Sequence, residues 1–206
     1  MTAIKIYGLP PSTFTRTVRL ACHEKGIDYE LVPTRPTELA ALNPFQKIPA
    51  IAHGDFTLFE SMAILRYLER TFGGPKLWPD EPREAALVDQ WACAVSDSLV
   101  NAALRYMAHR FGFLPVPEQM AQQFLDKTRQ FLPHFDRQLG RNRFIAGAVI
   151  SAADLYLAPP LFYFPDMPET KSILDDAPNC GRWLREMADR PSVRATEPAQ
   201  KPQVPA

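Results

Sequence analysis

Residues 43–49 of the chain read Asn-Pro-Phe-Gln-Lys-Ile-Pro, and residues 57–64 read Thr-Leu-Phe-Glu-Ser-Met-Ala-Ile. Pro49 holds Ile48 in an extended conformation, which suits pairing with the backbone of a bound peptide. The intervening segment 53–56 predicts a turn between two short strands. Apolar residues at helical spacing follow Ser61, so its helix start offers free N–H groups to a carboxylate. These features predict either a site for an acidic, peptide-like ligand or a plain hairpin with a helix capped by Ser61.

The preceding residues complete a small mixed sheet. The pattern predicts a strand over residues 3–7, a helix that begins after Ser12 or Thr13 and stops at Gly26, and a second strand over 28–33. A strand–helix–strand start implies a parallel pair, whereas the tight hairpin that follows is antiparallel. The first 72 residues therefore read strand, helix, strand, short helix, strand, strand, helix.

The rest of the chain has only helical patterns. They cover residues 83–111 and 117–139, a segment that opens at Ser151, and residues 178–189. The glycines and prolines at 73–82 predict a boundary. We therefore predict an α/β domain over residues 1–74, a linker over 75–82 and an all-helical domain over 83–206, with a loose tail in the last ten residues.

Composition excludes several classes of function. The 23 basic and 23 acidic residues balance, which argues against binding to nucleic acid or to an anionic membrane. No apolar run reaches the roughly 18 residues typical of a membrane helix, and the start of the chain carries no secretory signal pattern. The three cysteines are far apart and the four histidines lack metal-ligand spacing. We expect a cytoplasmic protein without a metal.

Ser12 is the candidate for chemistry. It lies where the first strand ends and the first helix begins, and a hydroxyl beside a helix N-terminus favours a thiolate. Thr13 and Thr15 are alternative hydroxyls, and a purely capping role for Ser12 is the competing interpretation. Cys22 lies inside the helix by its period and is expected to be a buried small side chain.

The chain resembles the cytosolic glutathione transferase family over nearly its whole length. The resemblance is carried by Lys5–Ser12, Glu24–Glu30, Asn43–Pro49 and Leu58–Ile64, and in the helical half by Phe144–Gly147 with Ser151–Asp154. It is closest to serine-type, phi-like members of bacterial or plant type. This resemblance implies a thioredoxin-like first domain with a four-stranded sheet, an all-helical second domain, a homodimer, and glutathione as co-substrate.

Carried onto this sequence, the resemblance assigns roles to seven residues. Ser12 would hydrogen-bond the glutathione sulfur, and Ile48, followed by a cis Pro49, would pair with the cysteinyl backbone. Glu60 and Ser61 would hold the γ-glutamyl end. Lys47 and Arg35 would reach the glycine carboxylate, although Arg35 is equally well interpreted as a solvated surface residue. Gln46 departs from the family pattern, which has glycine there.

The second substrate is expected to be a small, partly apolar electrophile. Candidate residues for its site are Phe14, Tyr106, His109, Phe111 and Phe113. Aromatic residues at helical spacing are more often core than pocket. Phe14 stands where the zeta-like isomerases carry cysteine, which argues against their chemistry. The alternatives are glutathione-dependent peroxidase or isomerase activity, or a non-catalytic binding or regulatory module on the same fold.

Two further expectations concern folding and assembly. Ser151 and Asp154 have the spacing of a capping box, which predicts a role in folding. Phe45 lies on the loop before the third strand, and the resemblance implies that it inserts into a second subunit as an interface anchor.

Overall fold

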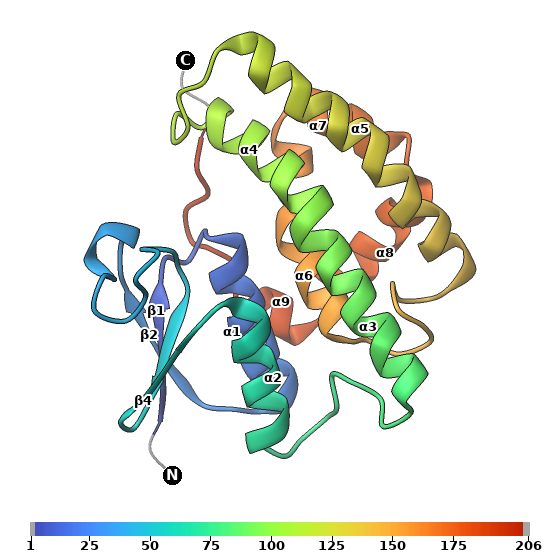
Figure 1. Ribbon diagram of the computed structural model, residues 1–206. Coiled ribbons are helices and arrows are strands. Elements are labelled where there is room, and N and C mark those ends of the chain that lie inside the picture. Colours follow the sequence, from blue (N-terminus) through green and yellow to red (C-terminus); the bar gives the residue numbers. More distant parts are fainter. Residues whose placement is uncertain (1–2, 204–206) are drawn as a thin grey trace. The chain divides into compact units, whose positions relative to one another are not determined.

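A four-stranded mixed sheet forms the centre of the first of two units in the computed structural model, which describes residues 3–203 (Figure 1). The strand order is β2-β1-β3-β4. β1 pairs in parallel with β2, and the β1–β3 and β3–β4 pairs are antiparallel. The strands are β1 Ile4–Gly8, β2 Tyr29–Pro33, β3 Ala50–His53 and β4 Phe56–Phe59. The predicted mixed sheet is confirmed.

Helices α1 (Thr13–Lys25) and α2 (Ser61–Thr71) lie side by side on one face of this sheet (Figure 1). Ser12 caps α1 as expected, and Gly26 ends the helix with φ 67°, a left-handed conformation that glycine adopts without strain. The expected short helix between β2 and β3 is the 3₁₀ turn Pro36–Glu38.

The second unit, from Pro79 to Asp189, is helical. Its described elements are α3 Pro82–Ala94, the π-helical turn Val95–Val100, α4 Asn101–Arg110, α5 Glu118–Arg141, α6 Ala152–Leu161, the 3₁₀ turn Phe164–Asp166, α7 Pro168–Asp175 and α8 Pro178–Ala188. The single helical pattern predicted over residues 83–111 is interrupted by the π-helical turn. α7 was not predicted, because a helix of 8 residues shows little more than two turns of periodicity.

The division into units differs from the predicted domains at both ends of the helical domain. Leu77 and Trp78, which the sequence placed in a linker, are buried in the first unit, where the Arg66 guanidinium lies 4.2 Å from the centre of the Trp78 ring. Residues Arg190–Lys201 also belong to the first unit, and they include a short helix, α9 (Pro191–Ala195), that was not predicted. Side-chain contacts with α1 hold this segment, as described below.

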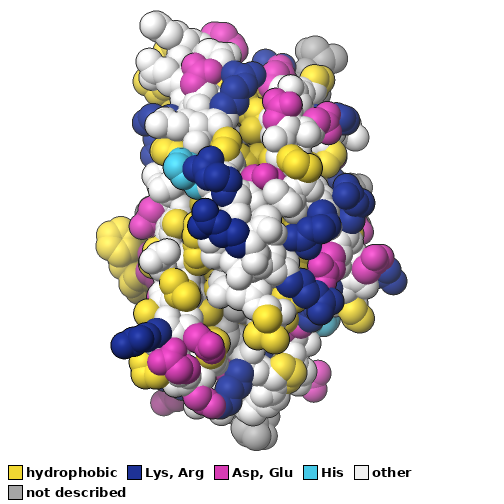
Figure 2. All heavy atoms as spheres, turned by 90° about the vertical axis from the view of Figure 1, so that its right-hand side faces the viewer, with side chains coloured by type: hydrophobic (Ala, Val, Ile, Leu, Met, Phe, Trp, Pro, Cys, Tyr) yellow, Lys and Arg dark blue, Asp and Glu magenta, His cyan; other side chains and the backbone are white. Residues whose placement is uncertain are grey.

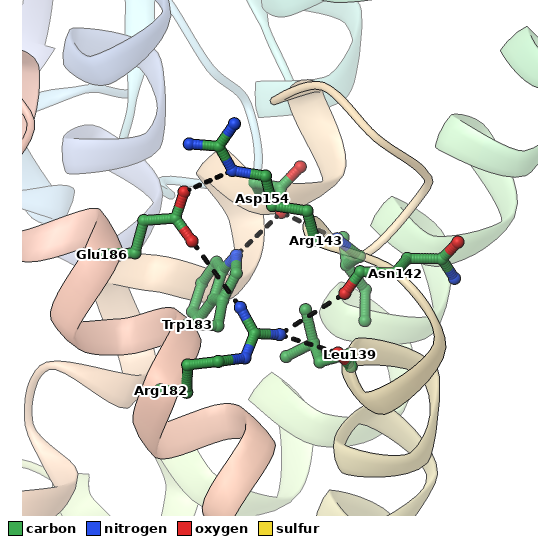
Figure 3. Close-up of polar contacts among 8 residues, drawn as sticks. Leu139, Asn142, Arg143, Asp154, Arg182, Trp183 and Glu186 are labelled. Carbon is green, nitrogen blue, oxygen red and sulfur yellow. Dashed lines mark hydrogen bonds and ion pairs between the residues drawn. The ribbon is translucent and has the colours of Figure 1, made fainter.

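Asp154 organises the second unit. Its carboxylate accepts hydrogen bonds from the backbone N–H and hydroxyl of Ser151 and from the N–H of Ile145, at 2.9–3.0 Å. It also accepts from Nε1 of Trp183 at 3.0 Å (Figure 3). The predicted capping box at the start of α6 is therefore confirmed. Burial raises the pKa of Asp154 to about 6, against the opposing effect of the four donors. Two distant segments thus converge on one buried carboxylate.

Charged side chains of both signs lie among apolar ones on the face shown in Figure 2. The described helices include none that combines the length and apolar character needed to cross a bilayer.

Candidate active site

The sheet register brings the predicted site residues to one edge. Tyr7 of β1 pairs with Ala50 of β3, and Ala50 in turn pairs with Phe59 of β4. The segments that follow Tyr7, precede Ala50 and follow Phe59 therefore lie at the same edge of the sheet. These segments hold Ser12, Ile48–Pro49 and Glu60–Ser61 respectively. Strand pairing thus gathers in one place residues from Ser12 to Ser61, which are 49 positions apart in sequence.

The end of β2 reaches the same edge. Gly8 pairs with Pro33, and the N–H of Thr34 donates to the Gly8 carbonyl across 3.3 Å. Arg35 follows directly and is exposed, with its backbone N–H bound to Glu38 at 2.9 Å. Arg35 therefore follows β2 at the same edge of the sheet as the segments that hold Ser12, Ile48 and Glu60.

Ser12 occupies the N-cap of α1. Its Oγ accepts a long hydrogen bond of 3.4 Å from the N–H of Thr15, and the side chain is half-buried. The hydroxyl proton is not needed for this capping contact, because Oγ acts as the acceptor. A hydroxyl beside a helix N-terminus with its proton available to donate suits an anionic ligand atom.

The alternative hydroxyls are enclosed in the first unit. Thr13 and Thr15 are 4% and 0% exposed, and among the described residues neither Oγ1 has a hydrogen-bond partner. Thr15 packs against β1, where a Cβ placed on Gly8 would lie 2.4 Å from Thr15 Oγ1. Cys22 is buried as expected, and burial raises the pKa of its thiol to about 12. Of these four side chains, Ser12 is the one that is not buried.

The loop before β3 has the predicted cis peptide bond between Ile48 and Pro49. Asn43 holds this loop: its Nδ2 donates to the Lys47 carbonyl at 2.7 Å and its Oδ1 accepts from the N–H of Phe45 at 3.0 Å. No role of its own was predicted for Asn43 from the sequence. Its position before a proline in a turn-forming segment was the available signal, because Asn side chains commonly bond to nearby backbone.

Two residues of the site have left-handed backbone conformations although neither is glycine. Gln46 has φ 49°, in the position where the resemblance led us to expect glycine, so the loop keeps a glycine-like geometry. Glu60 has φ 66° and immediately precedes α2, whose first residue is Ser61. Glu60, not Ser61, therefore occupies the N-cap position. Such conformations are sparsely populated and often occur at functional sites.

Lys47 and Glu60 are exposed, and Ser61 is half-buried. The site segments thus carry an ammonium at Lys47, next to Ile48, and a carboxylate at Glu60, directly before α2. This arrangement suits a ligand that carries carboxylates and an ammonium group joined by a peptide backbone.

The aromatic candidates in the second unit divide into buried and accessible residues. Tyr106 is 2% exposed, and burial together with the negative charge of Glu169 raises its pKa to about 12. His109 lies with Nε2 3.2 Å from Glu118. Phe111 packs against Tyr163 and Phe113, whereas Phe113 itself is 71% exposed. Phe14, in the first unit, is half-buried.

Comparison with known families assigns both halves of the chain. Residues 6–76 match the family described as glutathione S-transferase, N-terminal domain, and residues 117–186 match the glutathione S-transferase, C-terminal domain. The predicted resemblance to this family is therefore confirmed.

Individual proteins agree over nearly the whole chain. It is 31% identical to glutathione S-transferase 1 of Triticum aestivum, covering 94% of this chain and 93% of that protein, and 30% identical to glutathione S-transferase 1 of Zea mays, covering 98% and 99%. The structure of glutathione transferase F7 from Populus trichocarpa superimposes with a TM-score of 0.82 at 31% identity, covering 94% and 97%. A similar structure with a TM-score of 0.83 and 28% identity, covering 95% and 99%, is glutathione S-transferase I bound with lactoylglutathione. This chain belongs to the glutathione S-transferase family.

Proposed function

We propose that this chain is a cytoplasmic, homodimeric glutathione transferase that joins the glutathione thiolate to small, partly apolar electrophiles in detoxification. The observation that carries the proposal is the sheet register, which gathers Ser12, Ile48–Pro49 and Glu60–Ser61 at one edge. Each of the three meets a different part of a γ-glutamyl tripeptide. The thiol of glutathione loses its proton to solvent on binding. A sulfur lone pair then forms the S–C bond with the electrophile, and in an aryl halide the halide leaves with the electron pair of the broken carbon–halogen bond.

Ser12 has the role of lowering the pKa of the bound thiol. Its O–H donates to the sulfur while its Oγ continues to accept from the N–H of Thr15. The N-terminus of α1, a helix of 13 residues, adds a favourable electrostatic field for the anion. The buried Oγ1 atoms of Thr13 and Thr15 support this assignment to Ser12. Acceleration comes from thiolate formation and from proximity of the two substrates.

The other residues hold the glutathione backbone and its two ends. The N–H and carbonyl of Ile48 pair with the cysteinyl residue, in a loop that Asn43 fixes. Glu60 accepts from the γ-glutamyl ammonium and Ser61 donates to its carboxylate at the start of α2. Lys47 and Arg35, both exposed at this edge, attract the glycine carboxylate.

For the electrophile, the accessible aromatic residues are the better candidates. In the second unit, Phe111 and Phe113 offer apolar surface at the end of α4. In the first unit, Phe14 offers apolar surface in the first turn of α1. Tyr106 is buried and its high pKa keeps it protonated, and His109 is close to Glu118. We therefore propose that Tyr106 packs beneath the end of α4 and does not contact the electrophile, and that His109 is a polar group beside Phe111.

For the dimer, the proposal rests on a protruding side chain and a groove. Phe45 is 66% exposed on a loop that Asn43 fixes from within. In the second unit, a groove of about 280 Å³ lies between α4 with its preceding π-helical turn and α5. That volume is below the roughly 300–1,000 Å³ of small-molecule pockets, so it suits a single large side chain. Its lining residues are Asp97, Ser98, Asn101, Ala102, Arg105, Phe124, Lys127 and Phe131. Phe45 of one protomer inserts into this groove on its partner.

Glutathione titration of the purified protein tests the proposed activity. We expect saturable binding below the millimolar range, appearance of thiolate absorbance in the complex, and conjugation of an aryl halide. Absence of binding at millimolar glutathione would instead favour the non-catalytic module. A matched titration with glutathione esterified at the glutamyl α-carboxylate, or with a tripeptide that carries α-linked glutamate, tests whether Glu60 and Ser61 recognise the γ-glutamyl end.

A further inference from the structure

The C-terminal segment of the chain is fastened to α1 by three charged side chains. Arg16 and Arg19 donate to carbonyl groups at the end of α9, and Glu24 binds Arg190 just before it. The residues joined in this way are between 166 and 180 positions apart in sequence. All of them belong to the first unit. This contact between the end of the chain and α1 is hereafter called the C-terminal clamp.

The clamp reaches the first turn of α1 through Arg16. The backbone N–H of Arg16 donates to the Ser12 carbonyl at 2.8 Å. Its guanidinium donates to the Val193 carbonyl at 3.1 Å and to Thr196 Oγ1 at 3.4 Å. Arg16 is 3% exposed and Thr196 is fully buried. Because burying a guanidinium is unfavourable unless its donors are paired, these partners fix the position of Arg16.

Without the bonds of Arg16 to Val193 and Thr196, we expect the first turn of α1 to shift. Thr13 and Thr15 bury hydroxyl oxygens that have no hydrogen-bond partner in the described part of the chain. An unsatisfied buried polar atom destabilises the conformation that contains it. A displacement of the turn that brings these hydroxyls to water would remove this cost, and it would displace Ser12 with them. The long 3.4 Å contact from Thr15 N–H to Ser12 Oγ offers little resistance to that displacement.

The other end of the clamp lies far from Ser12. Glu24 is near the C-terminus of α1, and its carboxylate accepts from Arg190 Nε at 2.8 Å and Nη2 at 2.6 Å, and also from the hydroxyl of Ser192. The pair with Arg190 helps to keep the pKa of Glu24 below its ordinary value despite burial. The near and far ends of the same clamp can therefore be weakened separately.

We propose that the C-terminal segment positions the first turn of α1 for catalysis. The bonds of Arg16 to Val193 and Thr196 keep this turn in place, and the turn keeps the Ser12 hydroxyl in position to donate to the glutathione thiolate. The proposal rests on the proposed function of Ser12. Arg16 is a positioning residue, because it acts on the reaction through α1. The far end, Glu24 with Arg190, contributes to stability alone.

The experiment compares Arg16→Met with Glu24→Gln in the full chain. The first readout is amide hydrogen exchange of residues 12–16, which requires no glutathione. We expect faster exchange there in Arg16→Met and wild-type exchange there in Glu24→Gln, even where both variants lose stability to urea. Unchanged exchange of these amides in Arg16→Met overturns the proposal, whether or not the protein binds glutathione.

The second readout is the pH profile of thiolate absorbance and of turnover with glutathione bound. In Arg16→Met the pKa of the bound thiol should rise by about one unit, which lowers the thiolate fraction about tenfold at a pH below both values. Turnover should recover at higher pH, and KM for glutathione should change little. A lower kcat at every pH with an unchanged thiol pKa would make Arg16 merely structural and overturn the proposal.

Thr196→Val provides a second test if Arg16→Met is not recovered folded. This substitution removes the acceptor of Arg16 Nε. It should speed exchange of residues 12–16 and raise the thiol pKa, each by less than Arg16→Met does. Thr196→Ser keeps the hydroxyl and should have wild-type exchange and thiol pKa. Wild-type values in Thr196→Val overturn the proposal. Ser12→Ala separates the role of Ser12 in lowering the thiol pKa from the role of Arg16 in ordering the first turn of α1. An unchanged thiol pKa in Ser12→Ala, together with faster exchange in Arg16→Met, would refute the first role and support the second.

Discussion

The indole Nε1 of Trp183 donates to Oδ1 of Asp154 across 3.0 Å, although the two residues are 29 positions apart. Both side chains are fully buried, so this bond joins α8 to the start of α6 inside the second unit. The same Oδ1 accepts from the N–H of Ile145. Loss of the indole donor therefore leaves part of a buried charge without compensation.

We expect Trp183→Phe to lower the free energy of unfolding by about 1.5–3 kcal/mol, the range for a hydrogen bond to a charged group, with a further loss from the smaller ring. Urea unfolding measures this change. Trp91→Phe is the matched control, because Trp91 is half-buried in the same unit and packs on Phe135. Equal destabilisation by both substitutions would show that ring volume, not the bond to Asp154, is responsible.

The raised pKa of Asp154 should make the free energy of unfolding depend on pH. Its pKa in the folded protein is raised from 3.8 to about 6, so the folded state binds the proton more tightly than the unfolded state. Its contribution to stability is therefore fully present below about pH 4 and is lost as the pH rises through 6. The rise of about two units corresponds to an order of 3 kcal/mol. Wild type should lose that amount relative to Asp154→Asn between pH 4 and 7, and a constant difference between the two proteins would contradict the prediction.

Ser12→Ala should raise the pKa of bound glutathione and lower turnover at neutral pH by about ten- to a hundredfold. That range follows from losing one hydrogen bond to a charged group, about 1.5–3 kcal/mol. Affinity for glutathione should stay nearly constant, since the Ile48 backbone and the Glu60–Ser61 pair remain. Stopped-flow thiolate absorbance and steady-state kinetics measure both effects. Thr15→Val is the control, and an equal loss there would transfer the role to Thr15.

Glu60→Gly should separate the effect on folding stability from the effect on glutathione binding. Its φ of 66° is unfavourable for a residue with a Cβ, so Glu60→Gly relieves backbone strain while it removes the carboxylate. We expect Glu60→Gly to weaken glutathione binding with no loss of folding stability, and calorimetric titration with urea unfolding measures the pair.

Ser61→Ala should weaken binding by removing a donor to a carboxylate. Tight binding in both variants would show that these residues only start the helix.

Phe45→Ala should weaken the proposed dimer by on the order of 2 kcal/mol or more, as expected for an aromatic anchor that fills a groove. Light scattering across a dilution series measures the dissociation constant. Phe113→Ala is the control, because Phe113 is similarly exposed but lies away from the groove lining given above. A monomeric wild type, or equal dissociation of the two variants, would remove the role of Phe45.

The sequence by itself determined the features that depend on neighbouring residues. Periodicity and turn residues predicted the mixed sheet and the long helices, and the cap at Ser12 and the Ser151–Asp154 box were predicted because capping bonds join residues three positions apart. The resemblance to a known family added the cis Pro49 and the set of site residues.

Tertiary structure decided the rest. The return of Arg190–Lys201 to the first unit depends on buried hydrogen bonds of Arg16 and Arg19, and those bonds exist only once the chain ends meet. The left-handed backbone at Gln46 and Glu60 and the exposure of Ser12 relative to Thr13 and Thr15 likewise follow from strand pairing and packing. Local propensity cannot specify them, because the groups that stabilise each of these features come from distant parts of the chain.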